Sequence, residues 1–212
     1  MECKNELDVE NNIIIEKNNI PKTSSKSLED IINLDDIINY ISSSLYSIIQ
    51  NNKIMKIKQS RGSNEPFYSK KIPVLSLNKY LVRIMKYTES ENNTLIVSYL
   101  YIKKLIKIEN FILGINNVYR LLLGAVILAK KVLEDIRYEN SYYCNIGGIT
   151  NSELNQIEYS LFSRLDFNVN LKMEEVNIVY EEIYKSLSNA RLEEIFNKKD
   201  INDNVNNKND NI

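Results

Sequence analysis

Histidine is absent from all 212 residues of this sequence, and only two cysteines occur, Cys3 and Cys144. Without histidine the chain cannot build His-based acid–base catalysis, a Ser-His or Cys-His nucleophile, or a histidine-containing metal site. The two cysteines are far apart and outside any CxxC spacing, so they do not predict a disulfide and they fit a reducing compartment. We therefore expect a protein that is not an enzyme, has no cofactor or metal, and is nuclear, cytoplasmic or both.

Glycine and proline are also scarce, with 5 and 3 residues. A fold of many short strands and tight turns normally needs more of both, so their scarcity favours helices. The longest apolar run, Leu121 to Ala129, is shorter than the roughly 18 residues of a membrane-spanning helix and is followed by Lys130 and Lys131. A net charge of −1 gives no overall basic field, so we expect neither a nucleic acid nor a membrane partner.

Both ends of the chain are polar and rich in asparagine. They contain too few apolar residues for burial to offset the entropy lost on folding. We expect residues 1–27 and 191–212 to be disordered tails and residues 28–190 to form one domain. A third polar stretch, residues 56–65, is expected to be a linker inside that domain.

Between the tails, apolar residues recur every three or four positions, which is typical of amphipathic helices. This spacing predicts helices at about 35–51, 77–90, 93–107, 117–136, 151–165 and 173–188. Three predicted starts carry cap-competent residues, Ser76, Asn116 and Thr150, and the last has a capping-box glutamate at Glu153. The stretch Ile96–Tyr101 is also rich enough in β-branched and aromatic residues for a strand, but the spacing favours a helix.

The predicted helix at 117–136 differs from the others because it is apolar on nearly all sides from Leu121 to Leu128. A helix of this kind is surrounded by other helices, and its small residues Gly124 and Ala125 would let a neighbour approach closely. The fold class predicted is therefore all-α: a five-helix bundle around a central apolar helix, plus an N-terminal helix.

Few charged residues lie near the predicted core. Glu134 and Asp135 follow a pair of lysines by one turn, which favours a solvated, salt-bridged helix end over a pair of catalytic carboxylates. Lys131 follows the apolar helix directly, and Glu158 lies among the leucines and isoleucines of the 151–165 helix. Charges in such places are usually rim residues with stems on the core, and an interface role is the alternative.

Five segments between residues 67 and 167 carry motifs in a fixed order. They read FYSKKIPVLSLNKYLVRI from Phe67, VSYLYIKKL from Val97, NVYRLLLGAVILAKKVLED from Asn117, YENSYYCNIGGI from Tyr138, and ELNQIEYSLFSRLDF from Glu153. In order and spacing they resemble the single cyclin box of the P/U-type cyclins, the group typified by the phosphate-pathway cyclin of fungi. The resemblance implies a cyclin-box fold and a partner, the catalytic subunit of a cyclin-dependent protein kinase, which this chain would bind and activate.

The resemblance also implies site residues. In cyclins, a lysine that closes an L-A-x-K motif and a glutamate on a later helix contact the kinase, and these positions are Lys131 and Glu158 here. Three residues depart from the usual motifs: Tyr119 replaces a histidine, and Lys103 and Lys104 replace an aspartate and an arginine. The alternative function is a cyclin-like helical scaffold or transcription-associated adaptor that activates no kinase.

From these assignments we expect Lys131 and Glu158 to lie near each other on one exposed surface of the predicted 117–136 and 151–165 helices. Phe67, Tyr80 and Leu81 either border that surface or belong to the core. The residues expected to be buried between helices are Leu121, Leu122, Ala125, Ile127, Leu128 and Leu161.

Overall fold

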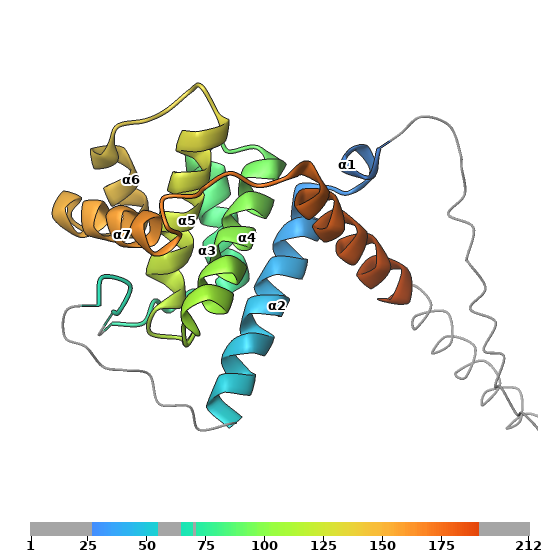
Figure 1. Cartoon of the computed structure of the whole chain (residues 1–212), viewed down its shortest axis with the longest axis horizontal. Coiled ribbons are helices and arrows are strands. Elements are labelled where there is room, and N and C mark those ends of the chain that lie inside the picture. The colour runs from blue at the N-terminus through green and yellow to red at the C-terminus, as the bar shows by residue number, and fades with distance from the viewer. Residues whose placement is uncertain (1–26, 55–64, 70, 191–212) are drawn as a thin grey trace, which may run out of the picture.

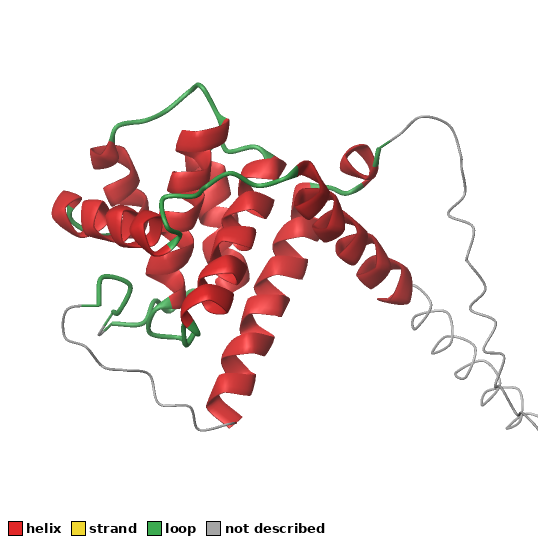
Figure 2. Ribbon diagram, in the orientation of Figure 1, coloured by secondary structure: helices red, strands yellow, loops and turns green. Residues whose placement is uncertain are grey.

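The computed structural model describes residues 27–54, 65–69 and 71–190, and every regular element in these ranges is a helix (Figures 1 and 2). The helices are α1 (Leu28–Ile31), α2 (Leu34–Ile54), α3 (Leu77–Thr88), α4 (Asn92–Glu109), α5 (Val118–Leu133), α6 (Asn140–Gly147) and α7 (Asn151–Arg164). A further helical stretch covers residues 173–190. The predicted all-α fold is confirmed, and Ile96–Tyr101 lies inside α4 and not in a strand.

Helix α5 is the centre of the fold. Its side chains are buried from Val118 to Lys130 with the single exception of Arg120, and it packs on α3, α4, α6 and α7. The reason is the composition already noted, since a helix with no polar stripe must be covered on every side. The buried residues include all of those expected, namely Leu121, Leu122, Ala125, Ile127, Leu128 and Leu161.

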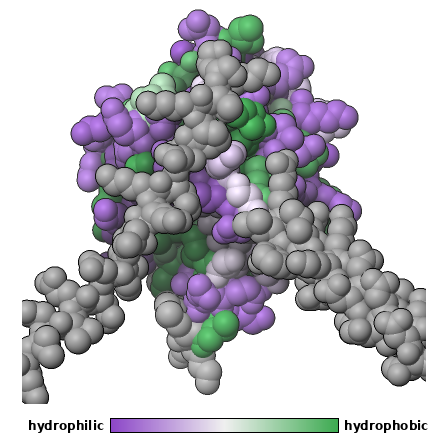
Figure 3. Space-filling view, turned by 90° about the vertical axis from the view of Figure 1, so that its right-hand side faces the viewer, coloured by the Kyte–Doolittle hydropathy of each residue, from purple (hydrophilic) through white to green (hydrophobic). Residues whose placement is uncertain are grey.

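Helix α2 and the 173–190 helix lie together beside this bundle (Figure 1). Helix α2 places its buried isoleucines against α3 and α4. The 173–190 helix buries Val179, Tyr180 and Ile183, and the Tyr40 hydroxyl of α2 donates to Glu182 at 2.7 Å. On this side of the molecule the visible surface is mostly hydrophilic, with separate hydrophobic areas (Figure 3).

Helix starts and ends follow local chemistry. The side chain of Ser76 accepts from the backbone N–H of Lys79, and Thr150 and Glu153 form a reciprocal capping box, as predicted. The expected cap at Asn116 is displaced by one residue, because Asn117 is the N-cap residue of α5. The Asn117 side chain does not cap the helix, since it bonds instead to the Gly114 N–H and the Ile112 carbonyl.

Two short helices, α1 and α6, do not follow from the apolar spacing. Helix α6 has 8 residues, too few for a clear periodic pattern, and its C-cap is Gly148, whose φ of 63° is left-handed. The helix buries Tyr143, Cys144 and Ile146 against its neighbours. The predicted tails lie outside the described residues except for Ser27, which is the N-cap of α1, and the predicted linker lies outside them except for Glu65.

None of the helices in the described ranges combines the length and the apolar character that crossing a membrane would require.

Candidate docking site

Lys131 and Glu158 meet where the end of α5 passes the middle of α7. The Nζ of Lys131 lies 2.6 Å from Oε1 of Glu158, and their side chains are 30 % and 13 % exposed. Their predicted proximity is confirmed. The pair is at the edge of the core, so it is accessible to a partner and still partly shielded from water.

A third residue, Asn140 at the start of α6, completes this group. Its Oδ1 accepts from Lys131 Nζ at 2.8 Å, and its Nδ2 donates to Glu158 Oε2 at 3.0 Å and to Asn155 Oδ1 at 2.8 Å. The three side chains therefore join three helices in one polar cluster. Sequence reasoning had not assigned a role to Asn140, although it lies in the motif that begins at Tyr138.

Close packing of α5 and α7 brings the pair together. A Cβ on Gly124 of α5 would collide with Cγ2 of Ile157, the neighbour of Glu158, so glycine permits this approach. The start of α7 is also tied to α5, because Glu153 of the capping box accepts from Arg120 at 2.5 Å. The capping bond from the Thr150 backbone, followed by the Arg120 bond, holds the pKa of Glu153 below its ordinary value.

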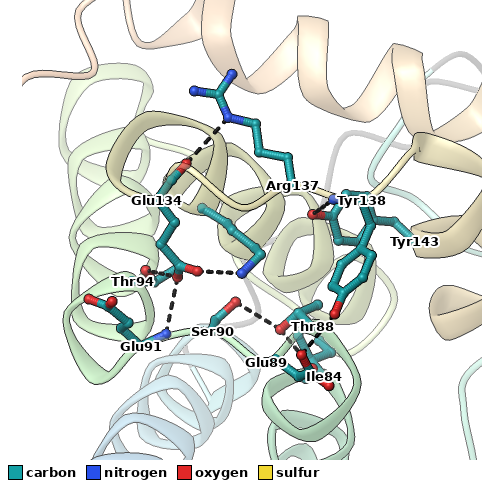
Figure 4. Close-up of polar contacts among 11 residues, drawn as sticks. Ile84, Thr88, Glu89, Ser90, Glu91, Thr94, Glu134, Arg137, Tyr138 and Tyr143 are labelled. Carbon is teal, nitrogen blue, oxygen red and sulfur yellow. Dashed lines mark hydrogen bonds and ion pairs between the residues drawn. The ribbon is translucent and has the colours of Figure 1, made fainter.

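The lysine just before Lys131 has the opposite environment. Lys130 is 1 % exposed, and its Nζ pairs with the Glu134 carboxylate. Glu134 also accepts hydrogen bonds from Thr94 Oγ1 at 2.5 Å and from the Glu91 backbone N–H at 3.0 Å (Figure 4). It is therefore bonded to the N-terminal end of α4. The expectation of a salt-bridged end is correct, but the expectation of a solvated one is wrong, because α4 covers it.

Burial of the Glu134 carboxyl would raise its pKa, but the hydrogen bonds from Lys130, Thr94 and Glu91 together outweigh burial and leave the pKa below its ordinary value. A buried carboxylate with these partners stays charged at neutral pH and keeps the end of α5 fixed on the start of α4.

The connection from α5 to α6 is held at a second point. The Tyr138 hydroxyl donates to Glu89 at 2.8 Å, and the Tyr138 backbone N–H donates to the Tyr143 hydroxyl at 3.2 Å (Figure 4). Glu89 is the C-cap of α3 and has a left-handed φ of 50°. These bonds fix Tyr138, two residues before Asn140, and so help to hold Asn140 at the Lys131–Glu158 pair.

Apolar side chains accompany the polar cluster. Val132 and Leu133, the two residues after Lys131, are half-exposed and line a groove with Val169, Leu171 and Met173. Tyr159, next to Glu158, is 68 % exposed. This combination of a partly shielded ion pair and exposed apolar groups is typical of a protein-docking surface.

Phe67, Tyr80 and Leu81 do not border this surface as exposed groups. Their exposed fractions are 0 %, 6 % and 0 %, so all three belong to the core. Phe67 packs edge-on against Phe111, and Tyr80 packs edge-on against Tyr119.

The three departures from the usual cyclin motifs all have partners inside the chain. The Tyr119 hydroxyl donates to the Leu75 carbonyl at 2.7 Å, and Lys104 donates to the Asn168 carbonyl at 2.8 Å. Lys103 lies over the Tyr99 ring and 3.8 Å from Glu182 of the 173–190 helix. The substituted residues thus connect α4 and α5 to segments that pack beside them.

Comparison with known proteins supplies the remaining finding. The model of the family described as Cyclin matches residues 6–169. Cyclin-U1-1 of Arabidopsis thaliana is 40 % identical over 116 residues, which are 53 % of this chain and 55 % of that protein. Cyclin-U4-1 of the same plant is 28 % identical over 164 residues, 76 % of this chain and 81 % of that protein. The PHO85 cyclin-like protein psl1 of Schizosaccharomyces pombe is 34 % identical over 112 residues, 52 % of this chain and 46 % of that protein. This chain therefore spans about half the length of two of these relatives and most of the third.

Proposed function

The chain belongs to the cyclin family, and we propose that it is a regulatory subunit that binds and activates a cyclin-dependent protein kinase. The observation that carries the proposal is the Lys131–Glu158 pair, with Nζ and Oε1 2.6 Å apart at the partly exposed edge of the core between α5 and α7. The proposed role is regulatory and not catalytic, and we place it in the nucleus, the cytoplasm or both.

Shape and charge support this surface as the kinase-binding face. A charged pair set among apolar groups fixes the register of a partner and rejects wrong partners more than it adds affinity. Lys131 and Glu158 already satisfy each other in the free chain, so neither is left as an uncompensated charge before the kinase arrives. Val132 and Leu133, which follow Lys131, and Tyr159, which follows Glu158, supply exposed apolar area on the same two helices.

Activation follows from binding to one conformation of the kinase. A regulator that binds the active arrangement more tightly than the inactive one shifts the kinase population toward activity. The regulator must then present a preformed surface, since mobility of its own groups would reduce that difference in affinity. Asn140 and the buried Lys130–Glu134 pair provide this rigidity, because they fix the end of α5 on both sides of Lys131.

The experiment is reconstitution with purified cyclin-dependent kinase catalytic subunits from the same organism. We expect one of them to co-elute with the full chain in size-exclusion chromatography and to phosphorylate a test peptide faster than the kinase alone. Stable co-elution without faster phosphorylation would favour the scaffold or adaptor alternative. Absence of any complex with the full set of such kinases would contradict the proposal.

A further inference from the structure

Positive charge is concentrated in the middle of the chain. Residues 51–133 contain 15 lysines and arginines and only 4 acidic residues, whereas the whole sequence has a net charge of −1. The net charge, on which the expectation of no membrane partner depended, therefore conceals a basic middle and acidic flanks. The local distribution of charge decides which surfaces attract an oppositely charged partner.

Three segments of this basic region meet at one end of the bundle, on its lower side in Figure 1. They are the C-terminal end of α2, the segment before α3, and the connection between α4 and α5. The Asn52 side chain donates to the Leu113 carbonyl at 2.9 Å, and the Ser69 backbone N–H donates to the Asn116 carbonyl at 2.7 Å. These hydrogen bonds join the three segments at one end of the molecule.

Large aliphatic side chains protrude from this end of the bundle. Val74 is fully exposed, and Ile54, the last residue of α2, is 75 % exposed, so both project away from the protein. Four further aliphatic residues are between 37 % and 46 % exposed here: Ile72, Leu75, Ile108 and Ile115. Exposed aliphatic groups gathered at one end of a protein mark an interaction site.

Exposed lysines accompany the aliphatic groups. Three lysines each directly precede one of the isoleucines, and none of them forms an ion pair with a described acidic residue: Lys53, Lys71 and Lys107. The acidic residues nearest to them in the chain, Glu65 and Glu109, are both paired with Arg164. The six aliphatic residues and three lysines together are called the basal surface below.

We propose that the basal surface binds the surface of an anionic lipid bilayer. The aliphatic side chains enter the region between the headgroups, and the lysines contact the anionic groups of the lipids. Apolar burial and electrostatic attraction add together in binding of this kind. Because each lysine adjoins an isoleucine, one orientation of the protein obtains both contributions.

The composition of this surface fits a bilayer better than a protein partner. Interfaces between proteins are enriched in aromatic residues and arginine, and they are depleted in lysine. The basal surface combines isoleucine, leucine and valine with lysine. A bilayer is also fluid, so it admits protruding side chains such as Val74 and Ile54 without a preformed pocket.

The basal surface and the docking pair lie at opposite ends of α5. The connection that carries Ile115 leads into α5 at Val118, and Lys131 lies about 20 Å further along the helix at 1.5 Å per residue. A bilayer at one end of α5 leaves the other end free for a kinase. The inference does not depend on the proposed function, and in a kinase complex it would hold the kinase at a membrane.

The test is co-sedimentation of the full chain with vesicles of phosphatidylcholine and phosphatidylserine in equal parts. We expect binding that weakens as salt rises and that is nearly absent with phosphatidylcholine alone. Lys53→Glu/Lys107→Glu should lower the partition coefficient by about tenfold or more, because two attractions become repulsions. The matched control, Lys172→Glu/Lys185→Glu, changes net charge equally at two exposed lysines outside the basal surface. It should lower the coefficient by no more than about twofold.

Tryptophan fluorescence identifies the side that enters the bilayer. The chain has no tryptophan, so Val74→Trp and Ile178→Trp each introduce a single one at an exposed position. When vesicles are added, the emission of Val74→Trp should shift to shorter wavelength because the indole leaves water. The emission of Ile178→Trp, on the 173–190 helix, should stay unchanged.

Four results would overturn the proposal. Equal losses in the two charge variants would mean that only net charge matters, and equal shifts in the two tryptophan variants would mean that no surface is preferred. Absence of binding to the acidic vesicles, or equal binding to phosphatidylcholine vesicles, would exclude an anionic bilayer as the ligand. Tighter binding to a labelled peptide of alternating glutamate and leucine would assign the basal surface to an acidic protein.

Discussion

Gly124 of α5 faces Ile157 of α7 so closely that a Cβ at position 124 would collide with Cγ2 of the isoleucine. The glycine therefore sets the distance between the two helices that carry Lys131 and Glu158. The same contact therefore sets the positions of Lys131 and Glu158, since Glu158 directly follows Ile157 and Lys131 lies two turns after Gly124.

Gly124→Ala should destabilise the protein although alanine is the better helix former. The gain in helix propensity is about 1 kcal/mol, whereas forcing an extra methyl group into a packed helix contact costs about 1–3 kcal/mol and displaces α7. Thermal or urea unfolding would measure the net loss. The paired variant Gly124→Ala/Ile157→Ala removes the colliding methyl group, so the two losses should be less than additive. Simple additivity would show that the helices do not meet at this point.

Reversing one charge of the docking pair should affect both stability and kinase binding. In Lys131→Glu or Glu158→Lys, like charges replace an ion pair that is partly shielded from water and shared with Asn140. The folding cost should lie between that of an exposed and a buried pair, about 1–2 kcal/mol. Kinase association should weaken by about 2–5 kcal/mol.

The exchange variant Lys131→Glu/Glu158→Lys separates these two effects. It restores an ion pair within the chain and should recover most of the lost stability, but it presents reversed charges to the kinase and should not recover binding. Calorimetric melting and kinase co-elution would be measured on the same samples. Normal kinase activation by the exchange variant would place the kinase-binding face elsewhere.

Lys130→Met should be more damaging than any change at Lys131. Methionine leaves Glu134 in a buried position without its cation, and removing one partner of a buried pair costs about 3–5 kcal/mol. The double variant Lys130→Met/Glu134→Gln keeps an acceptor for Thr94 and Glu91 without a charge, so it should be more stable than Lys130→Met alone. Chemical denaturation of the three proteins measures this order. A Lys130→Met protein as stable as wild type would mean that Lys130 reaches water.

The same pair predicts a pH dependence. The pKa of Glu134 in the folded protein is below its ordinary value of 4.5, so its contribution to stability is complete above that pH and is lost as pH falls through the folded pKa. Without Lys130 the pKa of Glu134 rises, because burial still raises it and one of the hydrogen bonds that lower it has been removed. The difference in unfolding free energy between wild type and Lys130→Met should therefore shrink as pH falls from about 7 to about 3. A difference that stays constant over this range would exclude Glu134 as its source.

The sequence determined the helical class, the central position of α5 and the caps at Ser76 and Thr150. Each of these depends on short-range chemistry: apolar residues on all sides of one helix, or a hydroxyl three residues before a backbone N–H. Motif order added the pairing of Lys131 with Glu158. Helix α6 could not be predicted from short-range patterns, because its stability comes from burial of Tyr143 and Ile146 against helices distant in sequence.

Only the tertiary structure decided which of two adjacent lysines is buried. Lys130 and Lys131 end the same apolar run, and nothing in the local pattern tells which of them is enclosed. Successive side chains on a helix point about 100° apart. Lys130 therefore faces α4 and is buried with Glu134, whereas Lys131 faces α7 at the rim. Which side of α5 each neighbouring helix covers is a property of the assembled bundle, and it separates a structural charge from an accessible one.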